Sequence, residues 1–216
     1  MHHDDRVTQS EIQKYITLQD QAVLEIGCGD GRVTTYLVDQ PRQLIALDPD
    51  PSRLKQAQSR FDQVGFFLGS GETLAFPDNS FDTVFFTLSL HHQDSVKALQ
   101  EAYRVLKPSG QVLILEPAND GELEKICNIF NDETVVLSQA LSAIESSKFI
   151  KQQSHTFYTE WAFADAEALY NWLFTYYEVP FNQTDRDQVI RLLGQKATES
   201  PLVLQDKTMI ACLSKQ

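Results

Sequence analysis

The chain has 216 residues and a formal net charge of −12 at pH 7, with 42% hydrophobic and 10% aromatic residues. This length suits one α/β domain and is too short for two domains of ordinary size. An acidic surface repels phosphate backbones and anionic lipids, which argues against nucleic-acid and peripheral membrane partners. We therefore expect residues 1–216 to form a single domain.

Three cysteines, Cys28, Cys127 and Cys212, are widely spaced along the chain. Their spacing fits neither a disulfide framework nor a zinc site. The sequence also contains no run of eighteen apolar residues and no signal-peptide pattern near its start. These observations predict a cytoplasmic protein with no metal site and no membrane span.

The first half of the chain alternates apolar strands with amphipathic helices. After a helix over 7–18, strands are predicted at 22–26, 43–47, 64–68, 81–87 and 111–115. Helices are expected to begin at about Gly31, at Pro51 and near Asp94. The inner stripe of the last helix is assigned to Val96, Leu99, Tyr103 and Leu106. This alternation indicates an α/β fold, a doubly wound Rossmann-like sheet that is mostly parallel, with helices on both faces.

The pattern is less regular after Pro117. Residues 120–147, 165–177 and 185–196 are predicted to be mostly helical, whereas 154–163 and 207–213 are predicted strands. We expect the last strand to be antiparallel. On this interpretation residues 20–117 form a cofactor-binding half, and residues 118–216 supply substrate or lid helices and the final strands.

A glycine-rich turn follows the strand at 22–26. Glu25, Gly27, Gly29 and Gly31 form the pattern E-x-G-x-G-x-G, and glycine allows positive φ and close approach of a ligand to the backbone. A helix beginning at about Gly31 would direct free N–H groups at that ligand. The turn lies at the carboxyl end of a strand, where doubly wound sheets bind ligands. The turn therefore predicts a nucleotide-like cofactor.

The glycine spacing distinguishes between two classes of cofactor. The dinucleotide pattern G-x-G-x-x-G requires glycine at position 32 or 34, where Arg32 and Thr34 stand. Asp48 closes the second strand, and its carboxylate could accept hydrogen bonds from two ribose hydroxyls. A helix cap is the alternative role for Asp48, although Asp50 fits that role better. A nicotinamide cofactor is thus disfavoured by the glycine spacing, whereas Asp48 fits either class of cofactor.

Five segments in order carry a resemblance to a known family. They are 23–31 (VLEIGCGDG), 46–48 (ALD), 74–82 (LAFPDNSFD), 90–92 (LHH) and 102–110 (AYRVLKPSG). Together they resemble class I S-adenosylmethionine-dependent methyltransferases, particularly the small-molecule branch that includes quinone-biosynthesis enzymes. The resemblance covers about residues 20–117. It implies direct transfer of a methyl group from S-adenosylmethionine to a small-molecule acceptor, and it identifies neither the acceptor nor the oligomeric state.

The resemblance also implies which residues contact the cofactor. The methionine part would be surrounded by Glu25, Gly27, Gly29 and Gly31, with Cys28 as a small filler. The ribose would be bound by Asp48, with Pro49 beside the adenine. The loop at the adenine edge would consist of Ser70, Gly71 and Glu72, and the sulfonium would lie near Thr87 and Leu88. Ser70 departs from the family, which often has aspartate at this position. No catalytic residue is implied, because the sulfonium is already activated.

Three residues stay open between structural and functional roles. His91 and His92 follow the strand at 81–87, where one of them could act as a general base or contact a lid. Glu116 ends the strand at 111–115 and could either face the acceptor or cap a neighbouring segment. A second function also stays open, in which the protein binds the cofactor or regulates without methyl transfer.

Overall fold

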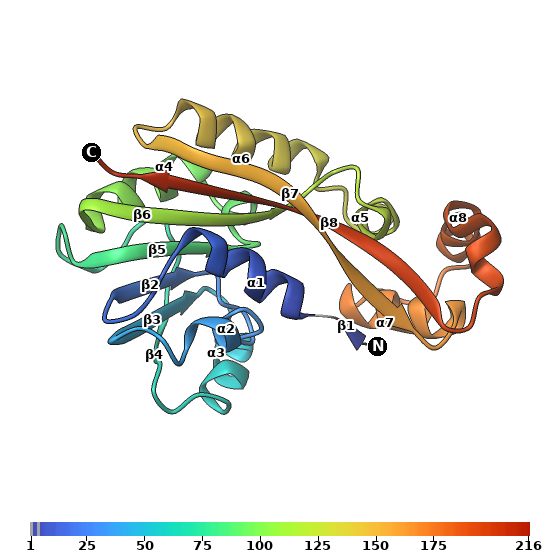
Figure 1. The fold of residues 1–216 in the computed structure, drawn as a ribbon. Helices are drawn as coiled ribbons and strands as arrows, with labels where there is room; N and C mark the ends of the chain where they lie inside the picture. Colours follow the sequence, from blue (N-terminus) through green and yellow to red (C-terminus); the bar gives the residue numbers. More distant parts are fainter. Residues whose placement is uncertain (1, 4) are drawn as a thin grey trace.

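The computed structural model describes residues 2–3 and 5–216 (Figure 1). In these residues eight strands form one sheet with the order β1-β7-β8-β6-β5-β2-β3-β4. The parallel part contains β2 (Ala22–Ile26), β3 (Gln43–Asp48), β4 (Gly65–Leu68), β5 (Phe81–Thr87) and β6 (Leu106–Pro117). The predicted doubly wound sheet is therefore confirmed, and its strand order reverses between β2 and β5.

The remaining strands are antiparallel. β8 (Leu202–Ser214) lies between β6 and β7 (Ile150–Phe163) and pairs antiparallel with both, while β1 (His2–His3) pairs with β7. The antiparallel last strand is thus confirmed. In Figure 1 β8 runs leftward to the C-terminus, so the carboxyl ends of the parallel strands face right.

Helices cover both faces of the sheet, as the sequence predicts. The described helices are α1 (Asp5–Tyr15), α2 (Thr34–Leu37), α3 (Pro51–Gln58), α4 (Ser95–Val105), α5 (Glu122–Cys127), α6 (Thr134–Ser146), α7 (Ala166–Tyr176) and α8 (Gln183–Leu193), with short 3₁₀ turns η1 (Leu90–His92) and η2 (Gly194–Thr198). Alternate residues of one strand point to opposite cores: Val84 and Phe86 pack with α4 and α6, whereas Phe85 packs with α1, α2 and α3. Burial on both faces explains why the centre of β5, residues 84–86, is continuously apolar.

Local signals place the helix starts. Asp50 caps α3 by accepting hydrogen bonds from the amides of Ser52 (2.7 Å) and Arg53 (3.2 Å), and Pro51 occupies the first helical position. Asp94 caps α4 in the same way. The predicted inner stripe of α4 is wrong at Val96, which is 53% exposed. The buried face instead consists of positions 95, 98, 99, 102 and 105.

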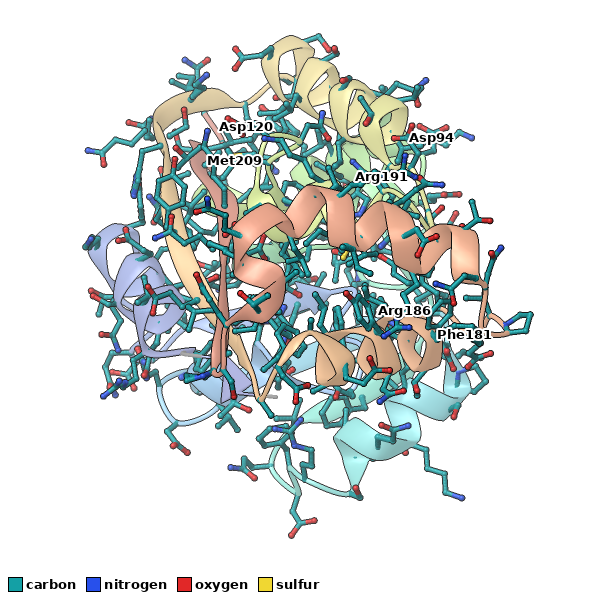
Figure 2. All side chains as sticks on the ribbon, turned by 90° about the vertical axis from the view of Figure 1, so that its right-hand side faces the viewer. Asp94, Asp120, Phe181, Arg186, Arg191 and Met209 are labelled. Carbon is teal, nitrogen blue, oxygen red and sulfur yellow. The ribbon has the colours of Figure 1, made fainter. Side chains whose placement is uncertain are left out.

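The second half of the chain builds a tip beyond the main sheet. β7 and β8 continue as a long ribbon that carries α7 and α8, and a third core joins these helices to α5. Figure 2 views the molecule from this side and shows α7 and α8 in front of the sheet. Arg186 of α8 lies over the ring of Tyr170 at 5.0 Å and donates to Glu167 at 2.7 Å. These contacts hold α8 against α7.

Candidate functional site: the carboxyl edge of the parallel strands

The loop after β2 folds back over the end of β3. The amides of Gly27 and Cys28 both donate to the carbonyl of Leu47, at 2.8 and 2.9 Å. Gly27, Gly29 and Gly31 have φ values of 78°, 55° and 86°. These left-handed conformations are easily accessible only to glycine, so the E-x-G-x-G-x-G pattern is a requirement of this loop geometry.

The three glycines differ in what surrounds them. A Cβ on Gly27 would lie 2.1 Å from Cβ of Ser89, and one on Gly31 would lie 2.8 Å from the ring of Phe61. A Cβ on Gly29 would meet no atom within 4 Å. Gly27 and Gly31 therefore serve close packing of the protein itself. Gly29 is where the backbone faces open space that a ligand could fill.

The predicted helix start at Gly31 is wrong. The segment from Gly29 to Val33 forms turns, and α2 begins only at Thr34 and has four residues. The positive φ of Gly31 is incompatible with a right-handed helix, which accounts for the delay. Any backbone contact to a ligand at this turn consequently comes from the loop itself.

Glu25 lies beneath the loop and is completely buried. Its carboxylate accepts hydrogen bonds from the hydroxyls of Thr34 (2.6 Å) and Thr87 (3.1 Å). Burial, together with the negative charge of nearby Asp48, raises the pKa of Glu25 to about 7, against the lowering effect of the two hydroxyls. The site therefore contains a carboxylate whose charged form is disfavoured until a cation approaches.

This shifted pKa predicts a pH-dependent stability. Between pH 4.5 and about 7 the folded chain holds the Glu25 proton that the unfolded chain releases, so the Glu25 contribution to stability falls as pH rises through this window. We expect Glu25→Gln to remove this loss. The free energy of unfolding of the variant, relative to that of the natural chain, should therefore increase by on the order of 2 kcal/mol from pH 5 to pH 8. Urea unfolding of both proteins at the two pH values measures this difference. The exposed Glu160→Gln is the control, and a pH-independent difference for Glu25→Gln would contradict the prediction.

Asp48 ties the glycine loop to the end of β3. Its Oδ2 accepts from the amide of Gly29 at 2.7 Å, and its Oδ1 accepts from the amide of Asp50 at 2.9 Å. The cap alternative fails, because Asp50 rather than Asp48 caps α3. Each carboxylate oxygen keeps a lone pair for a further donor. Asp48 thus lies directly beside the open glycine, and exposed Pro49 follows it.

The loop after β4 is attached to the start of α4. The amide of Gly71 donates to Oε1 of Gln93 at 2.8 Å, and Glu72 accepts from the amide of Asp94 at 2.8 Å. Half-buried Ser70 precedes them. The loop after β4 also meets β3, since the amide of Gly69 donates to the carbonyl of Asp48 at 3.1 Å. The loops predicted to share a site therefore do meet at one edge of the sheet.

The end of β5 carries a strained residue. Leu88 has a φ of 57°, which is rare for a bulky side chain and is held by a hydrogen bond from its amide to the carbonyl of Leu115 at 2.9 Å. Next to it, the hydroxyl of Thr87 lies 3.2 Å from the carbonyl of Gly27. Thr87 thus borders the glycine loop, and Leu88 follows it directly after β5.

Cys28 is buried within the same loop. Burial raises the pKa of its thiol, and the carboxylates of Glu25 and Asp48 raise it further. A thiolate nucleophile is therefore disfavoured here, in agreement with the prediction of a small filler.

The structure brings His91 of η1 and Glu116 of β6 together at the same edge of the sheet. Nδ1 of His91 contacts a carboxylate oxygen of Glu116, whose other oxygen accepts from the amide of Leu90 at 2.8 Å. Glu116 therefore does cap η1. Burial lowers the pKa of His91, but Glu116 and Glu133 overcome this effect and raise it to about 9. Glu133, at the start of α6, was missed in the sequence, which holds no motif that points to it.

The comparisons with known proteins agree with this geometry. A family described as a methyltransferase domain matches residues 24–114. This match supports the resemblance of residues 24–114 to class I methyltransferases. An uncharacterized methyltransferase of Mycobacterium tuberculosis is 34% identical over 101 residues, which cover 47% of this chain and 42% of that protein. The ubiquinone/menaquinone biosynthesis C-methyltransferase UbiE of Escherichia coli is 34% identical over 106 residues, 44% of this chain and 42% of UbiE. The chain thus spans less than half the length of these two relatives.

Solved structures match the whole fold. YcgJ of Bacillus subtilis has a TM-score of 0.71 at 20% identity and covers 98% of this chain and 99% of its own. A protein titled a putative methyltransferase of Bacillus halodurans has a TM-score of 0.70 at 19% identity, with 98% of each chain covered. These likenesses extend the fold to the region after residue 114. Members of the class use S-adenosylmethionine as the methyl donor.

No helix in residues 2–3 and 5–216 meets the length and apolarity that a membrane span requires. α6, with 13 residues, is the longest helix of this part of the chain. The cysteines Cys28, Cys127 and Cys212 are all free, as their spacing predicts.

Proposed function

We propose that the chain is an S-adenosylmethionine-dependent methyltransferase acting on a small-molecule acceptor. One observation carries most of this proposal: Asp48, at the predicted ribose position, is bonded to Gly29, the glycine that faces open space. The family match over residues 24–114 supports the same cofactor. The relatives described as methyltransferases support methyl transfer as the reaction.

The residues at the edge fit this cofactor. The open face of Gly29 leaves room for a ligand against the backbone, and Glu25 supplies a buried carboxylate in the preceding strand. An ammonium group, such as that of a methionine moiety, would favour the ionised form of Glu25. We keep the predicted contacts as proposals: Glu25, Gly27, Cys28, Gly29 and Gly31 at the methionine end, Asp48 and Pro49 at the ribose and adenine, Ser70, Gly71 and Glu72 at the adenine edge, and Thr87 and Leu88 near the sulfonium.

The chemistry divides between cofactor and protein. When bound, the cofactor supplies a methyl group that an acceptor lone pair or carbanion can displace directly. Asp48 would orient the ribose, and the loops after β4 and β5 would fix the two ends of the molecule. The protein then needs only to align the acceptor and exclude water. A dedicated base is required only for an acceptor that must lose a proton.

The acceptor side is proposed to lie in residues 118–216, within one domain that spans the chain. α7 and α8 stand in front of the carboxyl edge in Figure 2, and α5 follows directly after β6. Their position suits a lid over a small molecule. The formal charge of −12 is consistent with the absence of a nucleic-acid acceptor, and the three free cysteines are consistent with a cytoplasmic location.

The proposal is tested in two steps. Calorimetric titration with S-adenosylmethionine and with S-adenosylhomocysteine should show one site per chain, and the absence of binding to either would refute the proposal. Incubation with methyl-labelled cofactor and a fractionated metabolite extract should then transfer label to a small molecule. Heat-inactivated protein is the control.

Binding without transfer would support the alternative function, a cofactor-binding or regulatory protein. The fold permits this outcome, because a structure titled the [4+2]-cyclase SpnF is similar to this chain with a TM-score of 0.66 at 16% identity.

A further inference from the structure

Three metal-ligating side chains converge beside the proposed cofactor edge. His91 and His92 lie in η1, and Glu133 lies at the start of α6. Oε2 of Glu133 is 3.4 Å from Nε2 of His91, and its Oε1 is 3.7 Å from Nδ1 of His92. One donor atom from each residue lies within 4.8 Å of the other two. Donor atoms around a tetrahedral zinc ion lie roughly 3.3 Å apart, so the cluster is close to ligating geometry.

The buried histidine is oriented as a ligand. The side chain of His91 is only 1% exposed, and its Nε2 has no hydrogen-bond partner despite lying near Glu133. Its Nδ1 is bound by the carboxylate of Glu116, which the amide of Leu90 holds at 2.8 Å. A carboxylate on the far nitrogen is the usual support of a metal-bound histidine, because it fixes the ring and presents the other nitrogen.

The cluster is also accessible to an ion. The side chains of Glu133 and His92 are 20% and 58% exposed. A groove between α4 and α6 reaches His91 and is lined by Ser95, Thr134 and Ser138 among others. An ion can therefore enter from solvent, and rotation of exposed His92 can shorten the remaining distances.

We propose that His91, His92 and Glu133 form a binding site for a divalent transition-metal ion, with Glu116 as the residue that positions His91. Two imidazoles and one carboxylate suit Zn²⁺ or Fe²⁺ better than Mg²⁺ or Ca²⁺, which prefer oxygen donors. Three protein ligands leave at least one coordination position open. At this open position the ion could bind an oxygen or nitrogen of a small molecule. The site does not depend on methyl transfer.

Titration of the tag-free, chelator-treated protein with Zn²⁺ tests the site. We expect one ion per chain with micromolar or tighter affinity, and Co²⁺ substitution should give the visible absorption of a low-coordinate site. His92→Gln and Glu133→Gln should each weaken Zn²⁺ binding at least about tenfold, because each removes a ligand. Both positions are partly exposed, so both variants should fold. Thermal unfolding of both variants checks that they fold.

Matched controls separate this site from other histidines. His155 also pairs with a carboxylate, since its Nε2 lies 2.9 Å from Glu11, so His155→Gln should leave Zn²⁺ affinity unchanged. The double variant His2→Gln, His3→Gln excludes binding near the start of the chain. The proposal is overturned if the natural chain binds no Zn²⁺, or if folded His92→Gln and Glu133→Gln bind it as tightly as the natural chain. In that case the cluster is an ion pair alone.

Discussion

The Asp48→Ala variant is expected to bind S-adenosylhomocysteine at least about 100-fold more weakly than the natural chain, because hydrogen bonds to a charged group contribute roughly 1.5–3 kcal/mol each. Two hydroxyl bonds from the ribose are at stake in the proposed complex. The substitution also removes the hydrogen bond between the amide of Gly29 and Asp48 (2.7 Å), and so loosens the glycine loop itself. Calorimetric titration measures the affinity.

The chain offers a matched control two residues away. Asp50→Ala removes the cap of α3, which costs about 1 kcal/mol of stability, but leaves the ribose position untouched. The control should therefore unfold at a lower temperature and retain the natural affinity. If Asp48→Ala folds poorly, Asp48→Asn keeps one acceptor oxygen and tests the same role. Natural affinity in a folded Asp48 variant would disprove the ribose assignment.

Gly27→Ala is expected mainly to lower the stability of the fold, whereas Gly29→Ala is expected mainly to lower the affinity for the cofactor. Gly27→Ala places a methyl group 2.1 Å from Cβ of Ser89 on a backbone with φ of 78°. Overpacking and left-handed strain together cost about 3 kcal/mol or more, a fall in unfolding temperature of roughly 10 °C. Gly29→Ala meets no neighbour and should lose only about 1–2 kcal/mol. Its new methyl group instead occupies the open space beside the glycine loop, so cofactor affinity should fall.

Thermal unfolding and titration of both variants distinguish the two effects. Adding Ser89→Gly to Gly27→Ala removes the atom that clashes and should restore part of the lost stability, although it forfeits the bond from Ser89 to the carbonyl of Ile26. A Gly29→Ala variant with unchanged cofactor affinity would show that the ligand does not lie against this face.

The sequence predicted the parallel sheet well because burial on both faces leaves a clear pattern. β2 and β5 have the predicted bounds, since their apolar runs end at Glu25–Gly27 and at Thr87. β7 and β8 are longer than predicted. Residues 150–153 of β7, which precede the predicted strand at 154–163, are all exposed, and their sequence shows no alternation. Pairing of the backbone with β8 creates this part of the strand, and a burial pattern cannot reveal such pairing.

The residues of the candidate site also differ in whether the sequence could identify them. Glu25, Asp48 and the glycines could be selected from the sequence because each stands at the end of an apolar strand or in the turn that follows it. The partnership of His91 with Glu133 was not, because it depends on how α6 packs against η1 after an intervening loop. Likewise, Val96 was misplaced because apolar spacing alone does not show which face of a short helix packs on the sheet, and the small residues Ala98 and Ala102 are buried instead.

The place of β8 has a consequence for how the chain folds as it is made. β8 lies between β6 and β7, so β7 joins the rest of the sheet only through a strand that follows all the other elements. During synthesis the parallel strands can assemble while β6 still presents an unpaired edge. Completion of the sheet waits for residues 202–214 to leave the ribosome. The nascent chain is therefore most vulnerable to edge-to-edge aggregation just before its final strand is available.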